Sequence, residues 1–182
     1  MEIINIKKIV TCLALLSVVL LASPALVSAR AADNGPELPP MCGVIAAPEG
    51  SQLLFHTYAL GVQIYRWNGV RWNFVGPEAR LYADANYRGL VGTHYAGPTW
   101  ESNSGSTVVA SRVEGCTPDA AAIQWLLLRS VSNGGSGIFD KAVHIQRVNT
   151  AGGLEPAAPG SAVGEEKRVP YTAEYYFYRS QD

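Results

Sequence analysis

The sequence has few charged residues, and neither sign dominates. Of its 182 residues, 14 are Lys or Arg and 15 are Asp or Glu, which gives a formal net charge of −1. No segment gathers Lys and Arg into a stripe. Nucleic acids and anionic membrane surfaces attract proteins through such clusters. The composition therefore argues against both as partners.

The chain also lacks the motifs that mark several enzyme classes. It has no Gly-x-Gly-x-x-Gly after a strand, no Gly-x-Ser-x-Gly nucleophile elbow and no phosphate-cradling loop. Its three histidines, His56, His94 and His144, lie in or beside predicted strands and could bind zinc or copper only if they converged. No His-x-His or His-x-x-x-His pair is present. We therefore expect no metal and no cofactor, and an enzymatic function is not favoured.

Residues 1–31 have the three parts of a secretory signal peptide: a basic start, an apolar middle and a small-residue exit. The apolar run, 9–22, is shorter than the roughly 20 residues that span a bilayer. Small residues then permit cleavage after Ala29 or Ala31, and we favour Ala31. An uncleaved signal-anchor is the alternative. We predict a secreted or periplasmic protein with no membrane span in its mature form.

Cysteine is scarce: there are three, and Cys12 leaves with the signal peptide. Cys42 and Cys116 remain in a compartment where thiols tend to pair. Two cysteines without histidine at ligand spacing make a poor zinc site. We predict a disulfide between them in preference to a catalytic thiol.

The mature part, residues 32–182, has the length of one ordinary domain. It holds 11 basic and 14 acidic residues, a formal net charge of −3. Residues 32–41 contain three prolines and are predicted to be an extended lead-in. Residues 42–182 are predicted to form a single β-rich domain.

A hairpin is predicted around Asn68-Gly69. Residues 63–67 alternate side chains as a strand does, and 70–74 resume the pattern. Asn-Gly between two such runs favours a two-residue type I′ turn, which needs positive φ at both central positions.

Further strands follow. Residues 92–101, the polar turn 102–106 and residues 107–110 suggest a second hairpin. Two segments stay open: 77–82 as strand or helical turn, and the apolar run 123–131 as a buried strand or short helix. Other segments read as strands: 143–148, and 169–178, where Tyr171, Ala173, Tyr175 and Phe177 share one face.

The short strands, frequent turns and missing long amphipathic helix predict an all-β or β-rich single domain with short helical turns. An antiparallel sandwich and a distorted barrel both fit this pattern.

Four segments, 61–67, 94–101, 145–150 and 169–177, together resemble the DUF3455 family. The resemblance implies an exported protein, because the family occurs as exported proteins of bacteria, fungi and plants. It implies no activity. Fungal relatives are sometimes labelled malate dehydrogenase, but this chain lacks the βαβ alternation of a dinucleotide site.

His94, Tyr95, Trp100 and Glu101 form the most suggestive cluster. Imidazole, carboxylate and aromatic rings within one hairpin are what a sugar or small polar ligand would use. The alternative is that Trp100 belongs to the core and Gly97-Pro98 to a turn.

His144, Gln146 and Arg147 form a second polar cluster on an otherwise apolar strand, with Glu174 as a possible partner for Arg147. Such an ion pair would mainly fix strand register if buried, and would add under about 1 kcal/mol if exposed. A role in a ligand pocket is the second interpretation.

These patterns favour a non-enzymatic, exported β-domain that binds a small molecule, a carbohydrate or a cell-surface component through the 94–101 region. The alternative is a hydrolase or metal-dependent enzyme that uses His94, Glu101 and His144. An enzyme predicts that these three side chains converge in a cleft.

Overall fold

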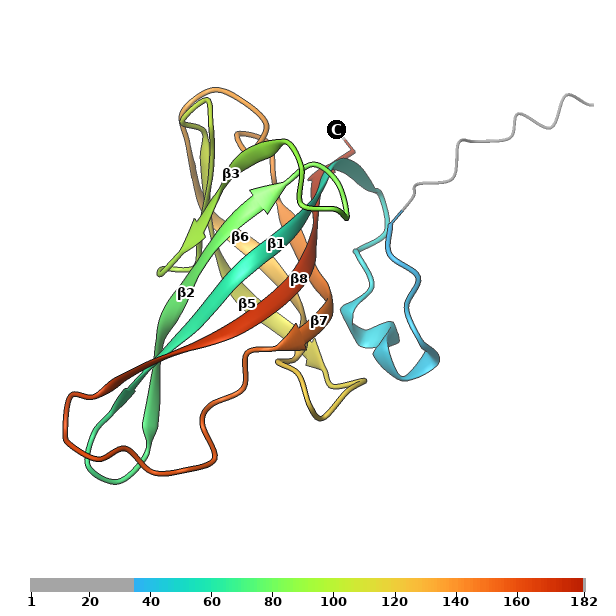
Figure 1. Cartoon of the computed structure of the whole chain (residues 1–182). Coiled ribbons are helices and arrows are strands. Elements are labelled where there is room, and N and C mark those ends of the chain that lie inside the picture. Colours follow the sequence, from blue (N-terminus) through green and yellow to red (C-terminus); the bar gives the residue numbers. More distant parts are fainter. Residues whose placement is uncertain (1–34, 182) are drawn as a thin grey trace, which may run out of the picture. The chain divides into compact units, whose positions relative to one another are not determined.

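The computed structural model describes residues 35–181, so the predicted signal peptide lies outside the described residues. The elements are η1 (Pro40–Ile45), β1 (Ser51–Trp67), β2 (Trp72–Tyr82), β3 (Leu90–Tyr95), β4 (Thr99–Ser102), β5 (Thr107–Cys116), β6 (Trp125–Gly134), β7 (His144–Gly152) and β8 (Glu166–Ser180). Each strand pairs antiparallel with the next, and β8 pairs with β1. The sheet therefore closes into a barrel, one of the two architectures that the sequence pattern fitted (Figure 1). Within residues 35–181, no helix has the length and apolar character that crossing a membrane requires.

The ring is uneven. β1 has 17 residues and β8 has 15, whereas β4 has four. The long strands β1, β2 and β8 extend beyond the others, next to the connection from β7 to β8 (Figure 1). One wall of the barrel is thus a broad twisted ribbon, and the opposite wall is built from short strands.

Side-chain alternation along β8 creates two apolar layers. Tyr171, Ala173, Tyr175 and Phe177 point into the barrel and are all buried, which confirms the predicted shared face. Tyr176 and Tyr178 point outward on the same strand, yet they are buried too. Something must therefore cover the outer face of β8.

The cover is η1. Cys42 and Ile45 of this short helix pack in one cluster with Leu127, Val148, Tyr176 and Tyr178. A disulfide joins Cys42 to Cys116 of β5, with the two Cα atoms 5.4 Å apart, as the sequence predicted. Gln146 donates from Nε2 to the Ile45 carbonyl oxygen at 2.6 Å and accepts from the Tyr178 hydroxyl. No pattern in the sequence predicted this second core.

The predicted hairpin between β1 and β2 is present, but the predicted turn type is wrong. Trp67 pairs with Trp72, so the loop has four residues, 68–71. Gly69 has φ of 97°, whereas Asn68 is not left-handed. Asn68 instead uses its side-chain Oδ1 to accept from the backbone N–H groups of Val70 and Arg71, both at 2.9 Å. This side-chain turn replaces the type I′ geometry.

The two segments for which strand and helix were both possible, 77–82 and 123–131, form strands. Residues 77–82 belong to β2, and most of 123–131 belongs to β6. The hairpin over 102–106 forms as predicted, but 92–101 is two strands rather than one. Its break is the turn at Gly97, where φ is 129°.

Candidate functional site

A cavity of about 360 Å³ is lined by residues from every strand, β1 to β8. Its lining residues are Gln63, Phe74, Val75, Gly76, Pro77, His94, Gly97, Pro98, Trp100, Arg112, Leu126, Leu128, Arg147 and Tyr175. Most of these side chains are apolar or aromatic, and none is acidic. A concave, largely apolar space with a few polar groups is the usual form of a small-molecule site.

His94 is the central polar group of this cavity. It lies opposite Trp100 in the β3–β4 register, and the two rings stack with centroids 4.2 Å apart and planes inclined by 11°. Its Nδ1 donates to the carbonyl oxygen of Thr99 at 2.8 Å, which leaves Nε2 without a proton. Burial lowers the pKa of His94 to about 3, and nearby Arg147 adds to that lowering. The imidazole is therefore neutral at pH 7.

Two arginines supply positive charge. Arg147 donates from Nε and Nη2 to the carbonyl oxygen of Gln124, at 3.0 and 2.8 Å. Arg112 lies over Gly115 on β5. Among residues 35–181 neither guanidinium forms an ion pair with a carboxylate. The cavity thus carries cationic groups without a facing acid.

Two buried nitrogens of the lining residues have no hydrogen-bond partner in the described part of the chain. They are Nε2 of Gln63 and Nε1 of Trp100. Both side chains are nearly fully buried, at 2% and 1% exposure. A buried donor left unpaired costs roughly 1–3 kcal/mol, so such groups are uncommon in native proteins. Both nitrogens belong to side chains that line the cavity, although the atoms themselves are fully buried.

The model of the family described as "Protein of unknown function (DUF3455)" matches residues 48–179. The chain belongs to the DUF3455 family. The match includes every residue that lines the cavity, whereas η1 with Cys42 lies before it. Searches among curated proteins and among solved structures found no match.

The barrel of this DUF3455 protein separates the residues of the first predicted cluster. His94 and Trp100 face the cavity. Tyr95 faces outward, and its hydroxyl donates to Oε2 of Glu101 at 2.8 Å on the exposed side. Alternation explains the split, because neighbouring residues of a strand point to opposite faces.

The second predicted cluster is divided in the same way. Arg147 lines the cavity, whereas Gln146 faces outward beneath η1. His144 lies outside the cavity, opposite Arg129 in the strand pairing, and partial burial lowers its pKa. The structure therefore brings together His94, Trp100 and Arg147, but not Glu101 or His144.

The predicted pairing of Arg147 with Glu174 is wrong. Arg147 pairs in register with Tyr175, which points inward, and Glu174 points to the opposite face.

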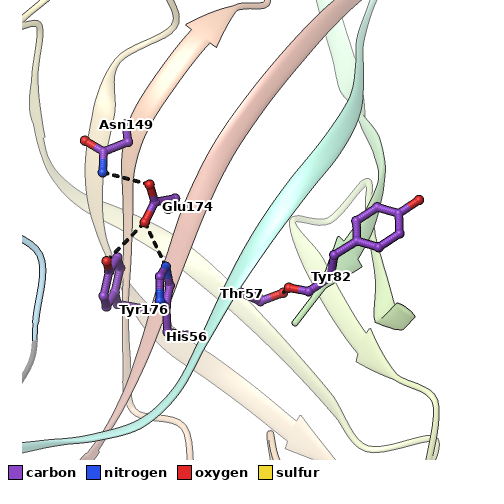
Figure 2. A network of polar contacts seen from close by, with 6 residues as sticks. All are labelled: His56, Thr57, Tyr82, Asn149, Glu174 and Tyr176. Carbon is purple, nitrogen blue, oxygen red and sulfur yellow. Dashed lines mark hydrogen bonds and ion pairs between the residues drawn. The ribbon is translucent and has the colours of Figure 1, made fainter. Parts of the chain in front are cut away.

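Glu174 instead anchors a polar network on the outer face of β1, β7 and β8 (Figure 2). Its Oε2 accepts from Nε2 of His56 at 2.8 Å and from the Tyr176 hydroxyl at 3.1 Å, while Oε1 accepts from Nδ2 of Asn149 at 2.9 Å. The His56 and Tyr176 rings stack at 3.9 Å. Burial lowers the pKa of His56 more than Glu174 raises it. Sequence reasoning missed this network because its central bond joins His56 to Glu174 across 118 residues.

Gln63 and Arg112 are cavity residues that the sequence analysis did not single out. Gln63 did carry a signal: it lies two residues before Tyr65 in the predicted strand, so both face the interior. A polar side chain on an apolar face marks a site. No pattern in the sequence marked Arg112 as a cavity residue. Within residues 35–181, no three His, Cys, Asp or Glu side chains gather where they could hold a metal ion.

Proposed function

We propose that this DUF3455 protein is an exported, non-catalytic binding protein that holds a small molecule inside its barrel. The observation that carries the proposal is the cavity of about 360 Å³ with apolar walls and unpaired buried donors. Ligand pockets run from about 300 to 1,000 Å³ and combine apolar lining with a few orienting polar groups.

Export is supported by two independent features. Residues 1–31 have the pattern of a cleavable signal peptide. The Cys42–Cys116 disulfide is compatible with an oxidising compartment, where such bonds persist.

The geometry favours an internal ligand over the other candidate functions. Trp100 is 1% exposed and covered by His94, so it offers no surface platform on which a sugar could stack. A hydrolase or metal enzyme built on His94, Glu101 and His144 would need the three to meet, and only His94 lines the cavity.

The proposal is tested by titrating the mature protein with N-phenyl-1-naphthylamine, a neutral aromatic dye that fluoresces in apolar surroundings. We expect saturable binding of one dye per chain, with Kd of about 10 μM or below. Val75 lines the cavity and is 41% exposed, so V75W can narrow the cavity without disturbing the core. V75W should weaken binding about 10-fold or more.

Val70 provides the matched control. It is 83% exposed, lies in the β1–β2 turn and does not line the cavity, so V70W should bind the dye as the wild type does. Near-ultraviolet circular dichroism confirms that both variants are folded. Absence of saturable binding, or equal loss in both variants, would refute the proposal.

A further inference from the structure

The charge of the cavity points to the class of ligand. Two of its fourteen lining side chains are arginines, and none is Asp or Glu. Elsewhere in residues 35–181, ion pairs join His56 to Glu174, Arg66 to Glu166, Lys167 to Glu165 and Arg168 to Glu78, and the other Lys and Arg side chains form none. Arg147 and Arg112 differ from the other unpaired cations because they line a cavity with largely apolar walls.

The partly buried position of Arg147 makes this arrangement costly without a counterion. Nε and Nη2 of its guanidinium both donate to the backbone carbonyl oxygen of Gln124. Because this partner is neutral, the positive charge of Arg147 stays uncompensated. A charge held in a largely apolar space is destabilising unless an opposite charge joins it. Arginine is also the residue best suited to bind a carboxylate with two parallel hydrogen bonds.

The remaining polar groups also match a ligand that accepts hydrogen bonds. The unpaired nitrogens of Gln63 and Trp100 are both N–H donors, and the unpaired hydroxyl of Tyr175 can donate or accept. His94 is neutral, so its Nε2 offers an acceptor to a ligand hydroxyl or amide. Apolar side chains such as those of Phe74 and Leu126 line the cavity and can contact a hydrocarbon or aromatic body of the ligand.

We infer that the ligand is a small organic anion, with one acidic group held near Arg147 and Arg112 and an apolar body among the aromatic and aliphatic walls. This inference rests on the proposed function, since it names the ligand class of the same cavity.

The test compares two dyes that share one aromatic body. N-Phenyl-1-naphthylamine is neutral, and 8-anilinonaphthalene-1-sulfonate adds a single sulfonate to the same skeleton. We expect the wild-type protein to bind the sulfonate at least about 10-fold more tightly, since a charge-assisted hydrogen bond adds this much. The preference should shrink as salt rises.

Variants at the two arginines locate the anion site. R147Q should lower the preference for the sulfonate about 10-fold, and R147K should restore part of it because the charge returns without the planar fork. R112Q should lower the preference less, because Arg112 lies at an exposed position. It also keeps the test decisive if R147Q does not fold.

R129Q is the matched control. Arg129 is an exposed arginine of β6 that does not line the cavity, so its loss changes the net charge equally and should leave the preference unchanged. If neither dye binds, the proposed function fails. If the neutral dye binds as tightly as the sulfonate, or R129Q matches R147Q, the cavity remains a binding site but the anion inference is wrong. Sulfonate binding that V75W does not weaken also contradicts it.

Discussion

At the scale of single residues, His94 decides the electrostatic character of the barrel interior. It stacks on Trp100 and lies edge-on to Tyr175, with the two ring centroids 5.2 Å apart. The hydrogen bond to Thr99 raises its pKa, but burial lowers it far more. A neutral imidazole leaves Arg147 and Arg112 as the charged groups of the cavity lining at pH 7.

This burial predicts a loss of stability in mild acid. The pKa of His94 is about 3 in the folded protein, against 6.5 for an unperturbed histidine. Below pH 6.5 His94 becomes protonated in the unfolded chain but stays neutral in the folded protein. The free energy of unfolding therefore falls as the pH drops towards 3. Between pH 6.5 and pH 5 we expect His94 to lower the free energy of unfolding by about 2 kcal/mol.

Urea denaturation of wild type and H94Q at a series of pH values measures this contribution. H94Q should show a shallower decline between pH 6.5 and 5. The lowered pKa values of His56 and His144 act in the same direction and leave a residual slope. H144Q is the matched control and should change the slope less, because His144 is less buried. If the free energy of unfolding of H94Q declines with pH as steeply as that of the wild type, the prediction is wrong, because protonation of His94 would then not destabilise the folded protein.

At the scale of elements, periodicity in the sequence carried most of the correct predictions. The inward face of β8 followed directly from the spacing of Tyr171, Ala173, Tyr175 and Phe177. The same alternation forbids His94 and Tyr95 from sharing a site, although their closeness in sequence suggested one. Register could not be predicted, because it depends on bulges such as the one between Ile64 and Tyr65.

Close approach of β1 and β2 requires a glycine at position 61. A Cβ atom there would lie 2.2 Å from the carbonyl oxygen of Glu78 and 2.5 Å from the Cα of Ala79, which are backbone atoms that cannot move aside. We expect G61A to lower the free energy of unfolding by about 1–3 kcal/mol, as overpacking does. Gly43 of η1 has no atom within 4 Å of such a Cβ, so G43A is the matched control. Equal stabilities of the two variants, measured in urea, would contradict this account.

At the scale of the whole molecule, composition and turn frequency were enough to predict an all-β single domain, but not to choose between sandwich and barrel. That choice rests on the pairing of β1 with β8, which joins Ser51 to Ser180 across almost the whole domain. The cavity was equally hidden, because its lining spans residues 63 to 175. Only His94, Trp100 and Arg147 of the predicted site residues reach it.

The disulfide acts on the same scale, because it links the segment before β1 to the end of β5. Cys42 and Cys116 are 74 residues apart in sequence, so the bond closes a long loop in the unfolded chain. Restricting that loop stabilises the folded state by about 4 kcal/mol. We therefore expect the double variant C42A/C116A, or the reduced wild type, to lose about this much free energy of unfolding in urea.

The reductant separates this effect from the loss of packing. Both cysteines are also buried beside Leu127 and Tyr176, so the double variant loses packing as well as the crosslink, whereas reduction removes only the crosslink. Dithiothreitol should destabilise the wild type and leave the double variant unchanged. Because η1 covers Val148 and Tyr176 on the outer face, its release should also open 35–50 to proteolysis before the barrel unfolds. Simultaneous cleavage of η1 and the strands would mean that the helix and barrel unfold as one unit.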